Sequence, residues 1–482
     1  MVVLHVDINA FFAAVEQQCH PSLRGKAIFV CGNPKTRTVV AACSYEAKAC
    51  GVKSGMSVGE ALQLCPHAIL VEGNPGKYIH TAIQIFGILK EYSPKMEIFS
   101  IDEAFLDVTD TQMLFGGAIA IAKEIKQRIK AEFGLTCSVG IAPNKLLAKL
   151  ASNMQKPDGL TVITPEDVEG KLRDLPVDKL CGIGEKMAGH LEKLGIKTVG
   201  ELGHYSRDKL IGIFGKNGEM LFNMGNGRDG GRVEMATKEP DTKSMGHSHT
   251  LSRDVTDLNR VKRHLLRLSE MVGRRLRIDG YAGRTVHFTV RFEDMETRSR
   301  QKTVDRYIDE GIEIYEVACA VMDEILADMG YRTTPTQPPP GRGRGYLIDS
   351  PTQPPSERGR GYRTDLPESL VYGLQSTVYS LPKPIRFVGV SVGNLIRYGH
   401  QMRFFEQAPV HEENKPAFIA PNDYGRRRRL IAAVDEINGR YGEFTVFRSS
   451  LIDTQLIQKT HGFLTTTEKR NRPDPYTPPR NR

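Results

Sequence analysis

The chain of 482 residues lacks several features that would assign it to a class at once. Its eight cysteines form no CxxC pair, and none has zinc-ligand spacing to a histidine, so we expect a reduced cytoplasmic protein without a zinc site. No apolar run approaches the ~18 residues that span a bilayer, so we expect no membrane partner. The apolar start MVVLHVDI has no preceding basic residues, and we expect no signal peptide.

The charge of the chain is basic. Lys and Arg number 66 against 57 Asp and Glu, which gives a formal net charge of +9. Such an excess favours a polyanionic partner such as a nucleic acid. Hydrophobic residues make up 40% of the chain, enough for cores in about three or four domains.

Strand and helix patterns alternate over roughly the first third of the chain. A β-branched run at residues 2–8 predicts a buried strand, and residues 78–93 predict a long amphipathic helix. Apolar residues from Ala118 to Phe133 share one helical face, and a strand and a helix are predicted at 135–141 and 144–154. This alternation predicts an α/β or α+β core.

The segment IFSIDEAFLDV, residues 98–108, places two adjacent carboxylates, Asp102 and Glu103, among apolar strand residues. An unpaired carboxylate is costly to bury, which leaves two readings. Both acids lie in solvent at a strand end, or a bend turns both toward one cation. Asp7 ends the first predicted strand, so the three acids become neighbours if the two strands pair.

Later segments suggest contacts with a polyanion. Gly182-Ile183-Gly184 predicts a tight turn before a helix, and LGIKTVGEL follows, which together match the helix-hairpin-helix pattern of DNA-backbone binding. Residues 258–280 predict a basic amphipathic helix, whose charges either are solvated or lie along phosphates. Strands are predicted at 284–292 and 385–395, and a helix at 430–442. A Pro-, Gly- and Arg-rich segment at 335–346 recurs at 351–362 and predicts a disordered loop.

Six motifs occur in one order along the chain: HVDINAFFAAVE, SYEAKACGVKSGM, SIDEAFLDVT, GIAPNKLLAKLASNMQKPDG, LCGIGEKMAGHLEKLGI and KSMGHSHTLSRDV. Together they resemble the Y-family translesion DNA polymerases, most closely the bacterial DNA polymerase IV type. The resemblance covers about residues 1–395, and the ordered set makes it specific although single motifs are not.

The resemblance implies an α+β multidomain fold shaped as a right hand. It has a ferredoxin-like palm, small fingers, a helical helix-hairpin-helix thumb and an α/β little finger. The implied boundaries are 1–10 and 75–165 for the palm, 11–74 for the fingers, 166–232 for the thumb, 233–243 for a linker, 244–396 for the little finger with a low-complexity insert at 333–366, and 397–482 for a basic tail.

The resemblance also implies the activity. The chain would be a low-fidelity, template-directed DNA polymerase, a mutator in DNA repair and replication, that extends primers across damaged bases. It would act as a monomer on primer–template DNA and dNTP. Two Mg²⁺ ions, about 3.5–4 Å apart, would lie among the catalytic acids. The implied metal ligands are Asp7, Asp102, Glu103 and the main-chain carbonyl of Ile8.

Further roles follow by resemblance from matching positions. Phe12 would exclude ribonucleotides, and the nucleotide would contact Phe11, Tyr45, Lys48 and Lys156. DNA would contact Gly182, Gly184, Lys243 and Ser244, and a sliding clamp would bind Gln401, Met402, Phe404 and Phe405. Two positions depart from the family pattern. Lys48 replaces the usual Arg, which reduces a bidentate phosphate contact to a point charge. Asn9 stands where Asp is common, and we expect little loss from it.

Two other readings remain open on the sequence. A nucleotidyl cyclase would typically carry a Gly-Gly-acid-acid turn, whereas Ser100 and Ile101 precede the acids here. A catalytically inactive scaffold that binds DNA or a clamp would be indicated by a lost acid, but all three acids are present.

Overall fold

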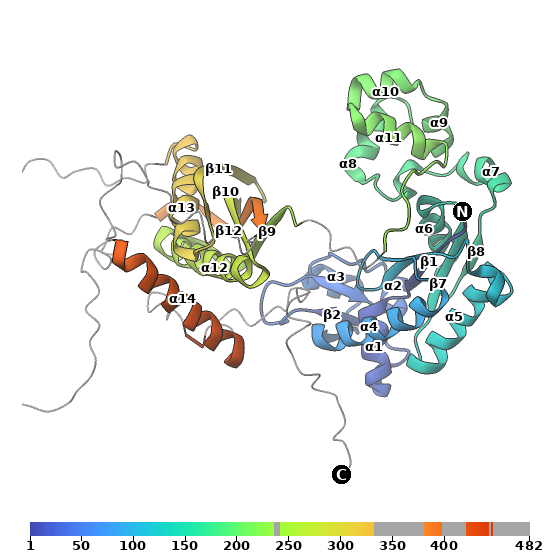
Figure 1. The fold of residues 1–482 in the computed structure, drawn as a ribbon, viewed down its shortest axis with the longest axis horizontal. Coiled ribbons are helices and arrows are strands. Elements are labelled where there is room, and N and C mark those ends of the chain that lie inside the picture. Colours follow the sequence, from blue (N-terminus) through green and yellow to red (C-terminus); the bar gives the residue numbers. More distant parts are fainter. Residues whose placement is uncertain (236–241, 332–379, 398–420, 443–444, 447–482) are drawn as a thin grey trace, which may run out of the picture. The chain divides into compact units, whose positions relative to one another are not determined.

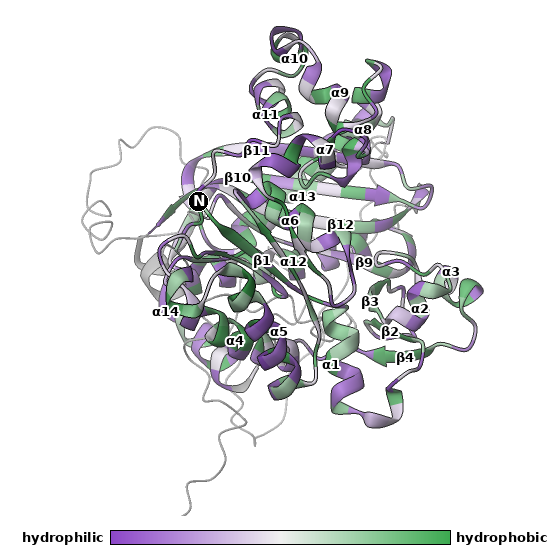
Figure 2. Ribbon diagram, turned by 90° about the vertical axis from the view of Figure 1, so that its right-hand side faces the viewer, coloured by the Kyte–Doolittle hydropathy of each residue, from purple (hydrophilic) through white to green (hydrophobic). Residues whose placement is uncertain are grey.

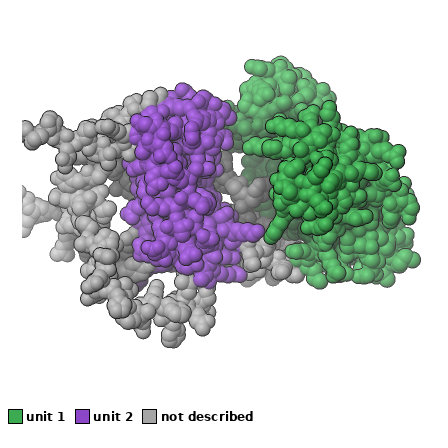
Figure 3. Space-filling view, turned by 90° about the horizontal axis from the view of Figure 1, so that it is seen from above, with its two compact units in different colours: residues 1–240, 459–464 green, residues 241–458, 465–482 purple. Residues whose placement is uncertain are grey.

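The computed structural model describes residues 1–235, 242–331, 380–397, 421–442 and 445–446 (Figure 1). The chain divides into two compact units, which Figure 3 distinguishes by colour. Unit 1 comprises residues 1–240 with 459–464, and unit 2 comprises residues 241–458 with 465–482.

A five-stranded sheet forms the centre of unit 1. In spatial order its strands are β5 (Met96–Ile98), β6 (Glu103–Asp107), β1 (Val3–Ile8), β7 (Cys137–Ala142) and β8 (Leu160–Val162). Neighbouring strands are antiparallel except β7 and β8, which are parallel. The central position of β1 places the end of the first strand beside the start of β6.

The two faces of this sheet have different neighbours (Figure 1). Leu4, Val6 and Ile8 of β1 point into one core, which they share with α1 (Phe11–Cys19), α4 (Pro75–Tyr92) and α5 (Ala118–Phe133). Val3 points to the other face and packs with α6 (Lys145–Met154). Because side chains alternate along a strand, His5 and Asp7 share the face of Val3. Figure 2 shows hydrophilic residues along α5, whose buried positions are Ile121, Ala122, Ile125 and Ile129.

A second, three-stranded sheet lies in the same unit. Its order is β3 (Val40–Cys43), β2 (Ile28–Cys31) and β4 (Ile69–Glu72), and β2 runs parallel to β4. Two short helices pack on it, α2 (Tyr45–Ala49) and α3 (Val58–Leu64). Each begins at a serine, because the hydroxyl oxygens of Ser44 and Ser57 accept hydrogen bonds from main-chain N–H groups of the first turn.

The described residues of unit 1 after β8 form a helical region. Its helices are α7 (Val168–Leu172), α8 (Glu185–Lys193), α9 (Val199–His204), α10 (Arg207–Phe214) and α11 (Lys216–Gly225). Short 3₁₀ turns occur at η1 (Pro21–Leu23), η2 (Gln112–Phe115), η3 (Pro165–Asp167) and η4 (Val177–Lys179). Thr198 and Glu201 form a capping box that starts α9. The buried residues of these helices share a core with α6.

Unit 2 contains a four-stranded antiparallel sheet. Its order is β11 (Thr297–Ile308), β10 (Tyr281–Phe292), β12 (Ser380–Arg397) and β9 (Ser244–Asp257). Two helices, α12 (Leu258–Asp279) and α13 (Gly311–Asp328), pack on the face that carries Val286, Phe288, Val290 and Phe292. The strict alternation of these four residues agrees with the half-exposed strand predicted there.

A further helix of unit 2, α14 (Pro421–Tyr441), is joined to the rest of that unit by ion pairs. Arg277 of α12 donates to both carboxylate oxygens of Asp435, at 2.7 and 3.0 Å. Arg428 donates to Asp309 at 3.0 Å. The basic helix α12 was predicted to hold its charges either in solvent or along phosphates, but Arg277 pairs within the protein and Arg267 is only 1% exposed. Neither reading therefore describes these two arginines.

Most predicted elements are confirmed, including the strand at 2–8, the helix at 118–133, the strands at 284–292 and 385–395, and the helix at 430–442. The strand pattern of residues 98–108 is interrupted, because β5 ends at Ile98 and β6 begins at Glu103. The repeated segments 335–346 and 351–362 and the clamp peptide at 401–405 lie outside the described residues. Within the described part of the chain, no helix combines the length and apolarity needed to cross a bilayer.

Candidate active site

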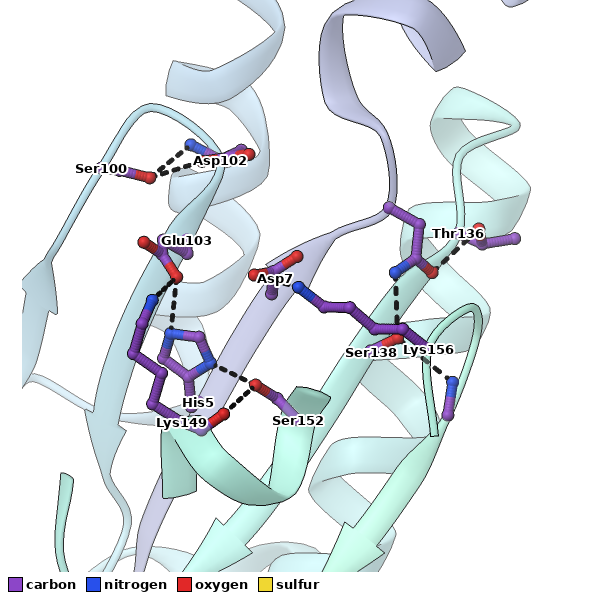
Figure 4. A network of polar contacts seen from close by, with 12 residues as sticks. His5, Asp7, Ser100, Asp102, Glu103, Thr136, Ser138, Lys149, Ser152 and Lys156 are labelled. Atoms are coloured by element: carbon purple, nitrogen blue, oxygen red, sulfur yellow. Dashed lines mark hydrogen bonds and ion pairs between the residues drawn. The ribbon is translucent and has the colours of Figure 1, made fainter. Parts of the chain in front are cut away.

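Two of the predicted carboxylates are direct neighbours across the pair β1 and β6. Asp7 is the register partner of Glu103, so both side chains leave the sheet at the same place (Figure 4). Ligand atoms of Asp7, Glu103 and His5 all lie within 4.8 Å of one another. The pairing of the two strands therefore brings together acids that are far apart in the sequence.

Asp102 lies in the bend just before β6. The bend is closed by main-chain hydrogen bonds from Phe99 and Ser100 to the carbonyl of Glu103, at 3.1 and 3.2 Å. The hydroxyl of Ser100 donates to the Asp102 carboxylate, and Asp102 is not one of the three grouped residues (Figure 4). Burial, with the nearby charges of Asp7 and Glu103, raises the pKa of Asp102. The carbonyl of Asp102 accepts from the Ile8 N–H at 2.9 Å, so its main chain joins β1.

Two lysine ammonium groups neutralise the grouped carboxylates. Nζ of Lys156 lies 2.6 Å from Oδ2 of Asp7, and Nζ of Lys149 contacts Oε2 of Glu103. Lys149 lies on α6, which packs on the face of the sheet from which the acids emerge. The two ammonium groups show that the carboxylates attract positive charge at this place. The carboxylate oxygens of Asp7 and Glu103 are ligands that suit a hard divalent ion such as Mg²⁺.

His5 connects Glu103 to α6. Its Nε2 lies 3.0 Å from Oε2 of Glu103, and its Nδ1 lies 2.7 Å from the hydroxyl of Ser152. Burial lowers the pKa of His5 despite the neighbouring carboxylate, which favours a neutral ring. Burial alone would raise the pKa of Glu103, but contacts with His5 and Lys149 outweigh it and lower the pKa to about 2. Glu103 is therefore ionised throughout the physiological range.

Asn9 holds the segment that carries Lys156. Its Oδ1 accepts hydrogen bonds from the Asp158 N–H at 2.8 Å and from the Thr136 hydroxyl at 3.1 Å, and its Nδ2 donates to Ser138 at 2.9 Å. Asn9 is only 2% exposed, and these contacts involve both polar atoms of its amide. The residue that departs from the family pattern thus positions the loop after α6.

The close approach of α6 to the sheet depends on Gly140 of β7. A Cβ atom at this position would lie 2.1 Å from the carbonyl oxygen of Ala148 and 2.4 Å from the nitrogen of Ser152. No side chain fits at such distances. Gly140 is also the register partner of His5, so α6 approaches the sheet most closely beside the His5–Ser152 contact.

Phe12 lies at the start of α1, and its ring is half-buried. It stacks on the ring of Tyr78 from α4, with ring centroids 4.4 Å apart and planes inclined by 18°. The Tyr78 hydroxyl donates to the buried Glu16 carboxylate at 2.7 Å, and this hydrogen bond fixes the Tyr78 ring on which Phe12 stacks. Phe11, by contrast, is only 3% exposed and packs into the core of the sheet.

Tyr45 and Lys48 lie on the short helix α2. Nζ of Lys48 lies 4.3 Å from the centroid of the Tyr45 ring, a cation–π contact. Burial and the nearby charge of Asp7 raise the pKa of Tyr45, and Asn9 opposes this effect. Tyr45 is therefore close enough to Asp7 to respond to its charge, while Lys48 is exposed.

Comparisons with known proteins agree with this arrangement. The impB/mucB/samB family matches residues 6–153, its C-terminal domain matches residues 242–335, and a thumb domain described for DNA polymerase-iota matches residues 178–229. The chain is 37% identical over 449 residues to DNA polymerase IV of Pelotomaculum thermopropionicum, covering 93% of this chain and 94% of that protein.

The chain belongs to the Y-family of DNA polymerases.

Further similarities extend to other Y-family proteins. DNA polymerase IV of Moorella thermoacetica is 43% identical over 318 residues, which cover 66% of this chain and 79% of that one. A solved Y-family DNA polymerase chimera superposes with a TM-score of 0.65 at 27% identity, covering 83% of this chain and all of its own. The predicted right-hand α+β fold is therefore confirmed. This Y-family polymerase is a translesion, template-directed DNA polymerase that acts on template–primer DNA and nucleotides, and polymerases of the family use divalent metal ions.

The positions predicted to contact DNA lie on loops and strand ends of this Y-family polymerase. Gly182 has a positive φ of 99°, and Gly184 is the N-cap of α8, with open space where a Cβ would lie. Lys243 and Ser244 are exposed at the start of β9. A cleft of about 540 Å³ adjoins the Lys149 side of the carboxylate group, and its cationic lining residues are Lys145, Lys149, Lys216 and Arg228. The clamp residues Gln401, Met402, Phe404 and Phe405 lie outside the described residues.

Three residues of this Y-family site escaped the sequence analysis: His5, Lys149 and Ser152. Lys145 and Lys149 are four residues apart on a helix that is otherwise largely apolar, and Lys145 pairs with Glu97 at 2.9 Å. Charged residues repeated at that spacing on a buried helix face are a usable signal. His5 offered a weaker signal, a single polar residue within a β-branched strand.

Proposed function

We propose that Asp7, Glu103 and Asp102, together with the main-chain carbonyl of Ile8, hold two Mg²⁺ ions and catalyse nucleotidyl transfer. The observation that carries this proposal is the register pair Asp7 and Glu103, each neutralised by a lysine ammonium group. Such ions, when bound, would lower the pKa of the primer 3′-hydroxyl and offset the charge of the triphosphate. Asp102 would turn from Ser100 toward the other acids, a change of one side chain in a short bend.

Lys156, Tyr45 and Lys48 bind the triphosphate in this proposal. Their support is the position of Lys156 beside Asp7, at 2.6 Å, and of Tyr45 close enough for Asp7 to raise its pKa. Ammonium and hydroxyl donors stabilise the charge that develops in phosphoryl transfer. Phe11 contributes through its main chain, because its ring is buried in the core.

Phe12 would select the sugar of the incoming nucleotide. Its support is the flat stack on Tyr78, which holds the half-buried ring in one orientation. A ring fixed in this way would clash with a 2′-hydroxyl and tolerate a deoxyribose. Low fidelity and a mutator character are part of the same proposal, and membership of the family supports them.

DNA is held outside the acids, by the turn at Gly182 and Gly184 and by Lys243 and Ser244. Support comes from the open turn before α8 and from the three lysines and one arginine that line the cleft of unit 1, together with Glu219 and Asp229. Exposed main-chain N–H groups and lysines bind phosphates without reading bases. Binding should therefore weaken steeply as the salt concentration rises.

The domain assignment is part of this proposal. The palm comprises 1–10 and 75–165, the fingers 11–74, the thumb 166–232 and the little finger 244–396. The division of the chain at residues 240 and 241, inside the expected linker, supports the last boundary. The enzyme would act in the cytoplasm, since all eight cysteines are free, and as a monomer, since one chain supplies every proposed residue.

Primer extension with Mg²⁺ tests the catalytic assignment. Glu103→Gln, which removes one charge and keeps the shape, should slow nucleotide addition more than about a hundredfold. Its affinity for primer–template DNA should stay near that of the unmodified chain. Glu132→Gln, which alters an exposed carboxylate on α5, is the matched control and should leave the rate unchanged. Extension by Glu103→Gln at the control rate would contradict the assignment, as would a native chain that binds DNA without adding nucleotides.

A sliding clamp would be bound by the peptide from Gln401 to Phe405. Tethering raises the local concentration of the polymerase at the primer end without new DNA contacts. Replacing Phe404 and Phe405 with Ala should leave extension without the clamp unchanged and remove the stimulation by the clamp. Product lengths with and without the cognate clamp decide this, and undiminished stimulation would place the tether elsewhere.

A further inference from the structure

Two cysteines and one histidine meet beside the three-stranded sheet, outside the catalytic carboxylate group. The sulfur atoms of Cys50 and Cys65 and a ring nitrogen of His67 all lie within 4.8 Å of one another. Sγ of Cys65 and Nε2 of His67 are 3.6 Å apart. The sequence predicted no zinc site, because it has no CxxC pair and none of its cysteines has a familiar zinc-ligand spacing to a histidine.

The ends of two helices create this cluster. Cys50 follows the last residue of α2, and Cys65 follows the last residue of α3. A turn closed by the Ala68 N–H and the Cys65 carbonyl, at 3.1 Å, folds His67 back over the Cys65 sulfur. Residues fifteen positions apart in the sequence are thus brought together by the packing of α2 and α3 on the same sheet.

The distances suit one tetrahedral zinc ion. With Zn–S bonds of about 2.3 Å and Zn–N bonds of about 2.0–2.1 Å, tetrahedral geometry places sulfur and nitrogen about 3.5 Å apart and two sulfurs about 3.8 Å apart. The Cys65–His67 distance of 3.6 Å already matches the first value. The other two distances are at most 4.8 Å, so rotations of exposed or half-buried side chains complete the geometry.

We propose that Cys50, Cys65 and His67 bind one Zn²⁺ ion, with water as the fourth ligand. Both thiols lose a proton to the solvent, two Zn–S bonds and one Zn–N bond form, and no electron is transferred. Two sulfurs and one imidazole select a softer ion than Mg²⁺, which prefers oxygen ligands. Cys65 is fully buried, Cys50 is half-buried and His67 is exposed, so the water ligand lies on the solvent side.

The ion would tie the end of α2 to the end of α3. Helix α2 has only five residues and carries Tyr45 and Lys48. A link at its last turn would hold those two side chains in place. This consequence depends on the proposed role of Tyr45 and Lys48, whereas zinc binding itself does not.

Cobalt spectroscopy of the full chain tests the site. Metal-free protein, kept reduced with a phosphine, is titrated with Co²⁺ in excess Mg²⁺. A sulfur-to-cobalt charge-transfer band should saturate at one equivalent and disappear on addition of one equivalent of Zn²⁺. Carboxylates of the catalytic group give no such band, so this result is independent of polymerase activity.

Variants assign the ligands. Cys50→Ser and Cys65→Ser should each remove most of the band, and His67→Asn should weaken binding at least about a hundredfold, since loss of an outer-sphere partner alone costs 10–100-fold. Cys19→Ser, which removes an exposed thiol of the same unit, is the control and should bind normally. Zn²⁺ should raise the melting temperature of the native chain and not that of His67→Asn.

Two results would overturn the proposal. One is the absence of the charge-transfer band at one equivalent of Co²⁺ in reduced, folded protein. The other is an unchanged band in His67→Asn, whose exposed side chain can be replaced without disturbing the core should either serine variant fail to fold.

Discussion

Lys156 is the substitution with the sharpest expected signature, because its ammonium group has opposite effects on two ligands. It lies 2.6 Å from Asp7, where it competes with any divalent ion for that carboxylate. The same ammonium group is proposed to bind the triphosphate once a nucleotide enters. Lys156→Met should therefore strengthen metal binding in the absence of nucleotide and weaken the binding of dNTP.

The structure sets the size of both effects. The side chains of Lys156 and Asp7 are 29% and 13% exposed. Their ion pair should therefore be stronger than a fully solvated one, with an interaction free energy of about 0.5–1.5 kcal/mol. Loss of this competitor should tighten metal binding about 2–12-fold. A hydrogen bond to a charged group contributes about 1.5–3 kcal/mol, so KM for dNTP should rise about 10–150-fold.

Two measurements separate these effects. Titration of free Mn²⁺ by electron paramagnetic resonance gives the metal affinity without nucleotide, and single-nucleotide extension at saturating metal gives KM. Lys156→Arg, which keeps the charge, should change both less. Lys130→Met, which removes an exposed lysine of α5, controls for net charge. An unchanged KM, or a weaker affinity for Mn²⁺, would show that Lys156 only braces Asp7.

Four other predictions follow from particular contacts. Phe12→Ala should raise the ratio of ribonucleotide to deoxynucleotide incorporation, whereas Tyr78→Phe, which keeps the ring stack, should not; equal changes would refute a sugar-selecting role. Asn9→Leu should lower stability by about 1–3 kcal/mol in thermal unfolding by leaving the Asp158 N–H unpaired, while Asn9→Asp should have little effect. Burial and the neighbouring His249, Arg260, Arg267 and Arg263 lower the pKa of His264 to about 4. Unit 2 should therefore lose about 1–3 kcal/mol of stability as the pH falls from 6.5 to 4, because only the unfolded state binds a proton at His264 over most of that range. Measured as stability against pH, this loss should be smaller in His264→Leu. Deleting residues 335–362 should leave the melting temperature unchanged, because their composition supplies no core, and a large drop would contradict the low-complexity reading.

Regular elements could be predicted wherever one face of the element is buried. Ile121, Ile125 and Ile129 are buried on α5 at helical spacing, and Val286, Phe288 and Val290 are buried on β10 at strand spacing, so periodicity located both. The bend at residues 99–102 was not predictable, because apolar residues beside and within it suggested a continuous strand. Ile98 and Phe99 are apolar, yet they are 47% and 50% exposed, and hydrogen bonds to the Glu103 carbonyl define the turn.

Asp7 and Glu103 were predictable as neighbours, but Asp102 lies outside their group, and the contact of Lys149 with Glu103 was not predictable. Lys149 meets Glu103 across 46 residues of sequence, and only the packing of α6 on the sheet creates the contact. The pairing of Arg277 on α12 was unpredictable for the same reason, because its partner Asp435 lies on a helix more than 150 residues later. Cys50, Cys65 and His67 likewise meet only because α2 and α3 end at the same place.

The arrangement of the active site depends on the absence of a Cβ atom at Gly140. The carbonyl of Ala148 would lie 2.1 Å from any Cβ at this position, so even alanine would lift α6 away from β7. Lys149, whose helix would move, would lose its reach to Glu103, and Ser152 would withdraw from His5. A single methyl group that touches neither DNA nor nucleotide would thus silence the enzyme. Among descendants of this sequence, position 140 should therefore tolerate substitution as poorly as the carboxylates themselves, although it has no side chain with which to do chemistry.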